Sequence, residues 1–152
     1  MNDITIRDIN MDNLARVKRI RIKENQENFI ETVDECLAEA EIHKEWCPVS
    51  IYAGEGIVGF AMYGAFGINP DVWIDRIIID ASHQGKGYGT AAMQQLMEIV
   101  MDKYSVRTVY LSFTSGNYVA QKIYEKLGFR FTEEFDSAGE LIYRYEATAG
   151  NI

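Results

Sequence analysis

The first part of the chain combines one alternating segment with one helical segment. Residues Ile4–Ile9 alternate apolar and polar side chains, which predicts a β-strand. The apolar spacing that follows predicts a helix over Met11–Lys23, with Asn10 or Asp12 as its cap. The side chains expected to face inward are those of Leu14, Val17 and Ile20.

A second helix is predicted from about Gln26 to Lys44, and Pro48 marks the change to strands. Its apolar stripe consists of Phe29, Val33, Cys36, Leu37 and Ala40. Three β-rich runs follow, separated by turns that contain glycine, and this succession favours an antiparallel meander. The three runs are Val49–Ala53, Ile57–Ala65 and Val72–Asp80.

The C-terminal half alternates helices and strands. The predicted elements are a helix over Thr90–Lys103, a strand over Val106–Phe113, a helix over Asn117–Leu127, and two paired strands over Phe129–Phe135 and Glu140–Tyr145. The whole order predicts an α/β (α+β) fold, with a mixed, mainly antiparallel central sheet flanked by about four helices. We expect residues 1–147 to form a single domain and residues 148–152 to be a frayed tail.

A glycine-rich loop, Gln84-Gly85-Lys86-Gly87-Tyr88-Gly89, lies between a hydrophobic strand and an amphipathic helix. Glycines let backbone N–H groups converge on an anion, and the positive end of the helix adds to the attraction, so the loop predicts a phosphate site. A Walker A loop is excluded, because glycine and not Ser or Thr follows Lys86. A dinucleotide loop is not favoured either, because seven residues separate Ile79 from Gly87.

The strand, short connection, Gln-x-x-Gly-x-Gly loop and helix resemble motif A of the GCN5-related N-acetyltransferases (GNAT), whose loop holds the pyrophosphate of acetyl-CoA. The residues that resemble motif B of the same family are Asn117, Ala120, Tyr124, Gly128 and Phe129. Val58–Gly64, Val72–Arg76 and the whole of motif A are similar, more narrowly, to the bacterial Blt-type spermine/spermidine acetyltransferases. The resemblance covers nearly the entire chain, and it departs from the family at Gln84, where arginine is commoner, and at Ala81, where many relatives have proline.

The resemblance implies an acetyl-CoA-dependent N-acetyltransferase, in which a primary amine attacks the thioester directly in a ternary complex. Backbone groups of the motif A strand should run beside the pantetheine arm, and one N–H group should stabilise charge on the thioester oxygen. The residues implied in acetyl-CoA binding are Ile77, Ile78, Ile79, Gln84, Gly85, Lys86, Gly87, Tyr88, Gly89, Thr90 and Asn117.

Two residues are implied in the proton transfers. Tyr124 matches the family's proton donor, and its phenol, with an ordinary pKa of about 10, can protonate the leaving thiolate; a packing role for the ring is the alternative. Asp75 matches the carboxylate that polyamine acetyltransferases carry on this strand. It would accept the ammonium proton through ordered water, only bind the ammonium, or form a structural ion pair.

Acidic residues are concentrated in one segment of a chain whose net charge is −8. Eight acids and a single base, Lys44, lie between Glu24 and Glu45. At helical spacing, one side of the predicted helix carries Glu24, Glu27, Glu31 and Glu35. This side is either a solvated surface or a wall that attracts a polycation. The resemblance favours the second interpretation, with spermine or spermidine as the amine.

The candidate contacts to the amine are Glu27, Glu31, Asp75 and Tyr63. Tyr63 and Trp46 would stack against a methylene chain or an ammonium group, or would simply pack in the core. Another small amine or a protein N-terminus stays open as the acceptor, and so does a CoA-binding module without turnover. The sequence does not decide which polyamine nitrogen is acetylated.

Composition narrows the remaining possibilities. A chain of 152 residues with 47% hydrophobic residues can build one well-packed domain. The acidic net charge argues against nucleic-acid binding. No run of about 18 apolar residues and no signal peptide is present, so we expect a cytoplasmic protein without a membrane partner. Cys36 and Cys47 lack metal-ligand spacing, and no metal is expected. A homodimer would be consistent with the resemblance.

Overall fold

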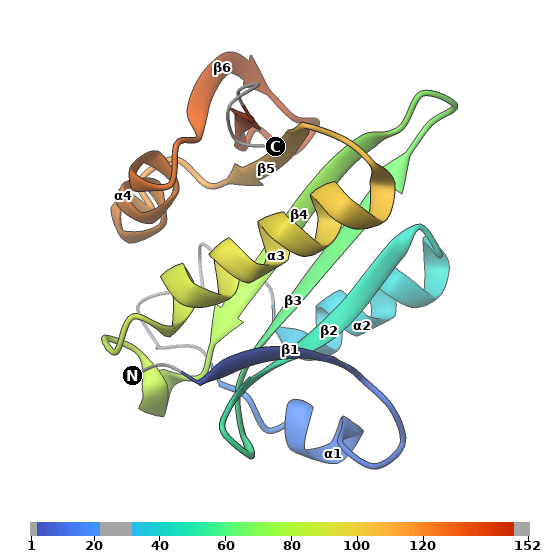
Figure 1. The fold of residues 1–152 in the computed structure, drawn as a ribbon, viewed down its shortest axis with the longest axis vertical. Coiled ribbons are helices and arrows are strands. Elements are labelled where there is room, and N and C mark those ends of the chain that lie inside the picture. Colours follow the sequence, from blue (N-terminus) through green and yellow to red (C-terminus); the bar gives the residue numbers. More distant parts are fainter. Residues whose placement is uncertain (1–2, 22–31, 148–152) are drawn as a thin grey trace.

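A computed structural model of the chain describes residues 3–21 and 32–147. In this part of the chain seven strands form one sheet in the order β1-β2-β3-β4-β5-β7-β6 (Figure 1). The strands are β1 Ile4–Asp8, β2 Trp46–Ala53, β3 Gly56–Phe66, β4 Asp71–Ile79, β5 Thr108–Phe113, β6 Arg130–Phe135 and β7 Leu141–Glu146. The helices are α1 Leu14–Val17, α2 Val33–Ile42, α3 Tyr88–Tyr104, α4 Tyr118–Lys126 and the short 3₁₀ helix η2 Ala81–His83.

The sheet is mainly antiparallel, as predicted. The meander of β2, β3 and β4 is confirmed, and so is the pairing of the last two strands, β6 and β7. The exception is the pair of β4 and β5, which run parallel. A parallel pair needs a crossover connection, and α3 supplies it.

Helices cover both faces of the sheet (Figure 1). On one face, apolar residues of α3 such as Met93 and Leu96 pack against the strands, including Ile74 and Leu111. On the other face, α1 and α2 bury Val17 and Cys36 against β3 and β4. No helix among the described residues combines the length and the apolar character needed to cross a bilayer.

The first helix is much shorter than predicted. It covers Leu14–Val17 and not Met11–Lys23, and its N-cap is Asn13 and not Asn10 or Asp12. The Asn10 side chain instead accepts hydrogen bonds from the N–H groups of Asp12 and Asn13. A turn closed by a side chain competes with helix formation, which explains the late start.

Helix α2 begins at Val33, and the predicted start near Gln26 lies outside the described residues. Thr32 precedes it in an extended conformation and forms a capping box with Glu35, in which each side chain accepts the other residue's N–H. Of the four acids on the predicted acidic side, Glu35 lies in α2, and the other three lie outside the described residues. The predicted inward positions Val33, Cys36 and Ala40 are buried.

Strand β4 departs from regular geometry at Arg76. The register pairs on either side are Met62 with Asp75 and Phe60 with Ile78. Arg76 and Ile77 therefore oppose Ala61 together, which is a β-bulge. Arg76 has a φ of 57°, in the left-handed region that a bulky residue rarely adopts. The bulge lies where the chain approaches the glycine-rich loop.

Candidate active site

The glycine-rich loop leads from β4 into α3. Gly85 and Gly87 both have a φ of 81°, a conformation that glycine adopts without strain. The Gln84 side chain donates a hydrogen bond of 2.8 Å to the carbonyl oxygen of Ile79 and so ties the loop to the end of β4. Helix α3 begins at Tyr88, two residues earlier than predicted, and its N-cap, Gly87, makes no side-chain capping bond. The N–H groups at this helix end are oriented to bind an anion.

A cavity of about 250 Å³, here the first cavity, lies between this loop, the end of β4 and α4. Ten of the eleven residues implied in acetyl-CoA binding line it, and the exception is Lys86. Four further residues line the cavity that the sequence analysis did not name as cofactor contacts: His83, Val119, Ala120 and Ile123. Helical spacing could have indicated Ala120, because it lies three positions after Asn117 and four before Tyr124, and such positions share a face.

The first cavity exists because β4 and β5 separate. Their register pair is Trp73 with Tyr110, near the start of β4. Beyond it, Ile77, Ile78 and Ile79 line the cavity. An extended ligand can therefore lie along this edge of β4 and pair with its backbone groups, as another strand would.

Tyr124 lies on α4, and Asn117 is the N-cap of this helix. The Asn117 side chain accepts a hydrogen bond from the N–H of Ala120. The Tyr124 ring packs beside Phe113, with 5.5 Å between the ring centroids. Burial and then the negative charge of Asp75 raise the pKa of Tyr124, so the phenol keeps its proton at neutral pH. The hydroxyl can therefore donate a proton into the first cavity.

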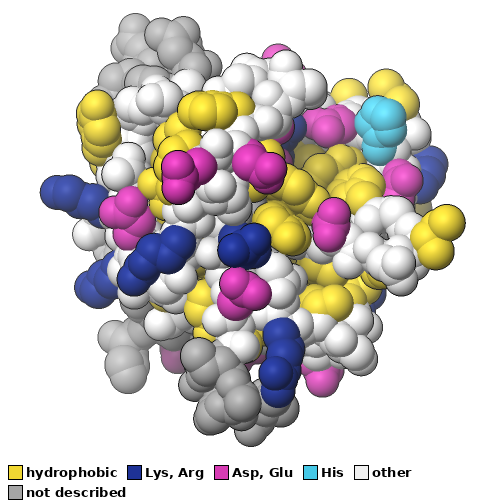
Figure 2. Space-filling model, turned by 90° about the horizontal axis from the view of Figure 1, so that it is seen from above, with side chains coloured by type: hydrophobic (Ala, Val, Ile, Leu, Met, Phe, Trp, Pro, Cys, Tyr) yellow, Lys and Arg dark blue, Asp and Glu magenta, His cyan; other side chains and the backbone are white. Residues whose placement is uncertain are grey.

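A second cavity, of about 280 Å³, lies on the α2 side of the sheet. It is lined by Trp46, Phe66, Trp73, Asp75, Arg76, Ser112 and Asp136. Trp46 and Phe66 meet edge to face, with 4.8 Å between centroids. At Gly64 an added Cβ would lie 2.6 Å from the carbonyl oxygen of Glu45, so only glycine lets the chain before Trp46 approach so closely. Seen from above, the molecule has a hollow lined by hydrophobic side chains, with Asp and Glu side chains at its border (Figure 2).

Asp75 is the buried carboxylate of the second cavity, with 11% of its side chain exposed. Burial raises its pKa to about 7, although the adjacent guanidinium of Arg76 and its N–H bond oppose this effect, and the charge of Glu140 adds to it. Asp75 also acts electrostatically on Tyr124, which lines the first cavity. A carboxyl of the second cavity and a phenol of the first therefore interact electrostatically, and the pKa values of both lie above their ordinary range.

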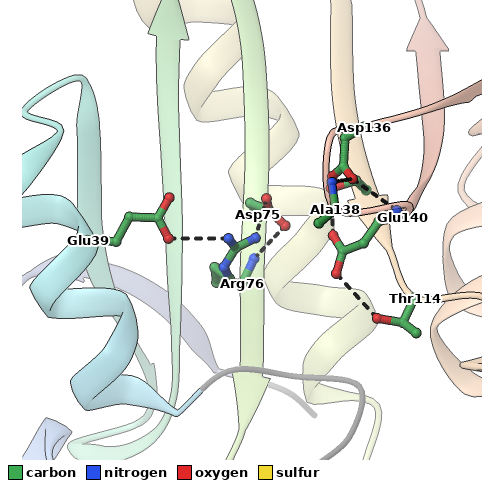
Figure 3. Close-up of polar contacts among 8 residues, drawn as sticks. Glu39, Asp75, Arg76, Thr114, Asp136, Ala138 and Glu140 are labelled. Atoms are coloured by element: carbon green, nitrogen blue, oxygen red, sulfur yellow. Dashed lines mark hydrogen bonds and ion pairs between the residues drawn. The ribbon is translucent and has the colours of Figure 1, made fainter.

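Glu140 faces Asp75 from the hairpin between β6 and β7 (Figure 3). The hydroxyls of Ser112 and Thr114 donate to its two carboxylate oxygens, at 3.0 and 3.2 Å. Its N–H donates to Asp136, which lines the second cavity. Sequence reasoning missed Glu140, because no local spacing relates it to Asp75.

Comparison with known proteins identifies the family of this chain. Residues 14–129 match the acetyltransferase (GNAT) family. The spermine/spermidine N(1)-acetyltransferase of Bacillus subtilis (strain 168) is 34% identical over 145 residues, which cover 91% of this chain and 95% of that protein. The chain belongs to the GNAT family.

Solved structures share this GNAT fold at low sequence identity. The spermidine N-acetyltransferase of Vibrio cholerae, in complex with CoA and spermine, superimposes with a TM-score of 0.71 at 18% identity, over 93% of this chain and 92% of that one. The PaiA N-acetyltransferase of Thermoplasma acidophilum, in complex with coenzyme A, gives 0.66 at 18% identity, over 95% and 99%. The GNAT family and the curated relatives make this chain an acetyl-CoA-dependent N-acetyltransferase.

The structure places Tyr63 on the face of the sheet opposite Asp75. Cross-strand partners share a face of the sheet, and Tyr63 pairs with Ile74, whereas Asp75 pairs with Met62. Tyr63 is 5% exposed on the α3 face, and the Lys103 ammonium lies 3.4 Å from its hydroxyl. The core-packing interpretation therefore holds for Tyr63. Its contact with the amine stays a prediction that this position does not favour.

Trp46 lines the second cavity, and its stacking against a methylene chain or an ammonium group stays a prediction. The acids Glu24, Glu27 and Glu31 lie outside the described residues, and their predicted contacts to the amine stay predictions. Among the acids of the same segment that are described, Glu39 reaches the second cavity through an ion pair with Arg76 of 3.2 Å.

Proposed function

We propose that this enzyme transfers the acetyl group of acetyl-CoA to a primary amine of a polyamine, spermine or spermidine, by direct attack in a ternary complex. The observation that carries the proposal is the second cavity, which is lined by three aromatic rings and two carboxylates, and one of these, Asp75, acts electrostatically on Tyr124 of the first cavity. A polyamine has apolar methylene segments and separate ammonium groups, and it matches both kinds of wall. The name of the Bacillus subtilis relative supports the same substrate class.

The first cavity is suited to acetyl-CoA. The left-handed glycines and the uncapped N-terminus of α3 offer backbone donors for a pyrophosphate. The edge of β4 at Ile77–Ile79 would pair with the pantetheine arm, and one of its N–H groups would stabilise the charge that develops on the thioester oxygen. Lys86 does not line this cavity and would contribute only at longer range.

Asp75 would accept the proton that the amine must lose before it attacks. An alkylammonium has an ordinary pKa of about 10, and a carboxylate with an ordinary pKa near 4 is a weak base for it. The pKa of about 7 at Asp75 makes it a better base near neutral pH, and the second cavity has room for a water that relays the proton.

Tyr124 would protonate the sulfur when the carbon–sulfur bond breaks and the new carbon–nitrogen bond has formed. The charge of Asp75 raises the pKa of this phenol, so the phenol is a poor acid while Asp75 is ionised. Once Asp75 has taken the amine proton, that opposing charge is gone. The two proton transfers would then assist each other, because the first makes the second easier.

The ammonium groups farther from the reacting nitrogen would be bound by several carboxylates. Asp75, Asp136 and Glu140 surround the second cavity, and we include Glu27 and Glu31 on the basis of the acidic sequence before α2. Exposed pairs contribute only about 0–1 kcal/mol each, so selectivity would arise from the set.

Steady-state kinetics with an amine panel test the proposal. Spermine, spermidine, a diamine, a monoamine and a peptide with a free N-terminus would be compared at saturating acetyl-CoA. We expect kcat/KM for spermine to exceed that for the monoamine by roughly tenfold or more, and to fall as salt is raised. Glu31→Gln should lower kcat/KM for spermine and leave the monoamine unchanged, whereas Glu55→Gln, in the exposed turn after β2, should affect neither.

Two outcomes would contradict the polyamine assignment. The first is a kcat/KM for spermine that neither exceeds that of the monoamine nor responds to salt. The second is faster turnover of the peptide N-terminus, which would instead assign that alternative acceptor.

A further inference from the structure

Arg76 joins two carboxylates that come from different parts of the fold (Figure 3). Its guanidinium lies 2.6 Å from Asp75 through Nη1 and 3.2 Å from Glu39 of α2 through Nη2. The side chains of Asp75 and Arg76 are 11% and 17% exposed. Ion pairs that are this well shielded from water are screened less than surface pairs, so their geometry is held more firmly.

The backbone of β4 is shaped for this contact. Neighbouring residues of a regular strand point to opposite faces, but the bulge at Arg76 changes the direction of its side chain. The φ of 57° at Arg76 is strained for a residue with a long side chain, and such strain persists only where surrounding contacts enforce it. The two ion pairs are contacts of this kind.

Arg76 also takes up part of the hydrogen-bonding capacity of Asp75. One carboxylate oxygen accepts the backbone N–H of Arg76 at 3.0 Å, and the other accepts the guanidinium at 2.6 Å. The carboxylate therefore cannot rotate freely, and each oxygen keeps a lone pair for an ammonium or a water. The rigid, planar guanidinium binds Asp75 through one nitrogen and Glu39 through another, which the point charge of lysine does not reproduce.

We propose that Arg76 is a positioning residue that orients Asp75 toward the acceptor amine, and that Glu39 acts on the reaction through Arg76. This inference rests on the proposed role of Asp75 in accepting the amine proton. Arg76 turns the carboxylate into one orientation, and Glu39 keeps the guanidinium in place from α2. Among the described residues, the charged and titratable groups around Asp75 are Arg76 on β4, Glu39 on α2, Glu140 before β7, Asp136 in the hairpin and Tyr124 on α4.

The test compares Arg76→Met, Arg76→Lys and Glu39→Gln with the wild type and with a control, Glu41→Gln. Glu41 lies on the same helix, is 81% exposed and pairs with Lys44. The acceptor is whichever amine the wild type acetylates fastest, so the test survives a failure of the polyamine assignment. The pH dependence of kcat is measured together with the titration of the Asp75 carboxyl carbon by NMR, which does not require turnover.

We expect Arg76→Met to raise the midpoint of the Asp75 titration, and of the acidic limb of kcat, by about one pH unit, because the opposing positive charge is lost. We also expect kcat to fall about tenfold while the KM for acetyl-CoA stays unchanged. Arg76→Lys should restore the titration midpoint and only part of kcat, because lysine restores the charge but does not hold Asp75 and Glu39 through two nitrogens of one rigid group. Glu41→Gln should behave as wild type.

Glu39→Gln tests whether Glu39 acts through Arg76. The Glu39 side chain is 29% exposed, so the substitution should leave folding intact. It should lower kcat in the wild type and have no further effect in the Arg76→Met background. Additive effects of the two substitutions would overturn the role of Glu39. An unchanged titration midpoint and an unchanged kcat in folded Arg76→Met would overturn the role of Arg76.

Discussion

Replacing Asp75 by asparagine should stabilise the fold at alkaline pH relative to the wild type. The folded protein holds the pKa of Asp75 at about 7, above the ordinary value of 3.8 that applies when the chain is unfolded. A raised pKa in a carboxyl group means that the folded state binds the proton more tightly. The contribution of this group to stability is therefore fully present below about pH 4 and is lost as the pH rises through 7.

The magnitude follows from the same two values. They differ by about three pH units, and each unit corresponds to about 1.4 kcal/mol, so ionising Asp75 in the folded state costs about 4 kcal/mol by pH 8. Asparagine resembles the protonated acid in shape and carries no charge at any pH. Arg76 keeps Glu39 as a partner in the variant, so the guanidinium is not left unpaired.

Urea unfolding of both proteins at several pH values between 4 and 8 measures this difference. The free energy of unfolding of Asp75→Asn, minus that of the wild type, should rise by about 4 kcal/mol across the range. Asp71→Asn is the matched control, because Asp71 is an exposed carboxylate at the start of the same strand. A difference that stays constant, or that falls as the pH rises, would refute the reasoning and with it the role of Asp75 as a base near neutral pH.

Two substitutions test the acetyl-CoA site. Gly89→Ala should fold normally, since the added Cβ would meet Ile79 at an ordinary 3.7 Å. It should weaken CoA binding by at least about tenfold in calorimetric titration, because the Cβ occupies the ligand's space. Gly56→Ala is its control, and equal affinity in both variants would remove the loop from the site. Tyr124→Phe should lower kcat by about 10²–10⁴-fold with CoA affinity unchanged, whereas the control Tyr143→Phe should leave kcat unchanged. Wild-type turnover in Tyr124→Phe would exclude Tyr124 as the proton donor.

The sequence alone predicted those parts of the site that are local in the chain. Turn geometry, helix polarity and strand alternation depend on residues a few positions apart, and a linear pattern records them. The glycine-rich loop, the start of a helix directly after it and the position of Tyr124 on α4 are of this kind. Each could be read from spacing, together with the resemblance to the GNAT motifs.

Local competition limited the same reasoning at helix starts. Thr32 and Glu35 close a capping box at the start of α2, and Asn10 closes a turn, so α1 begins later than its apolar periodicity suggested. Periodicity describes which face of a helix is buried, but a side chain that binds backbone N–H groups decides where the helix begins.

Only the tertiary structure decided which side chains meet. The bulge at Arg76 gives Asp75 an ion-pair partner, the β5–β7 pairing brings Glu140 toward Asp75, and the register of β3 with β4 places Tyr63 on the opposite face. Strand register and sheet order join residues that are tens of positions apart, and a shift of one residue would exchange the two faces. The sequence by itself therefore determined the family, the loop that suits acetyl-CoA and the proton-donor candidate. The raised pKa of Asp75 and the composition of the second cavity depend on burial and on contacts between distant strands, which exist only once the sheet has formed.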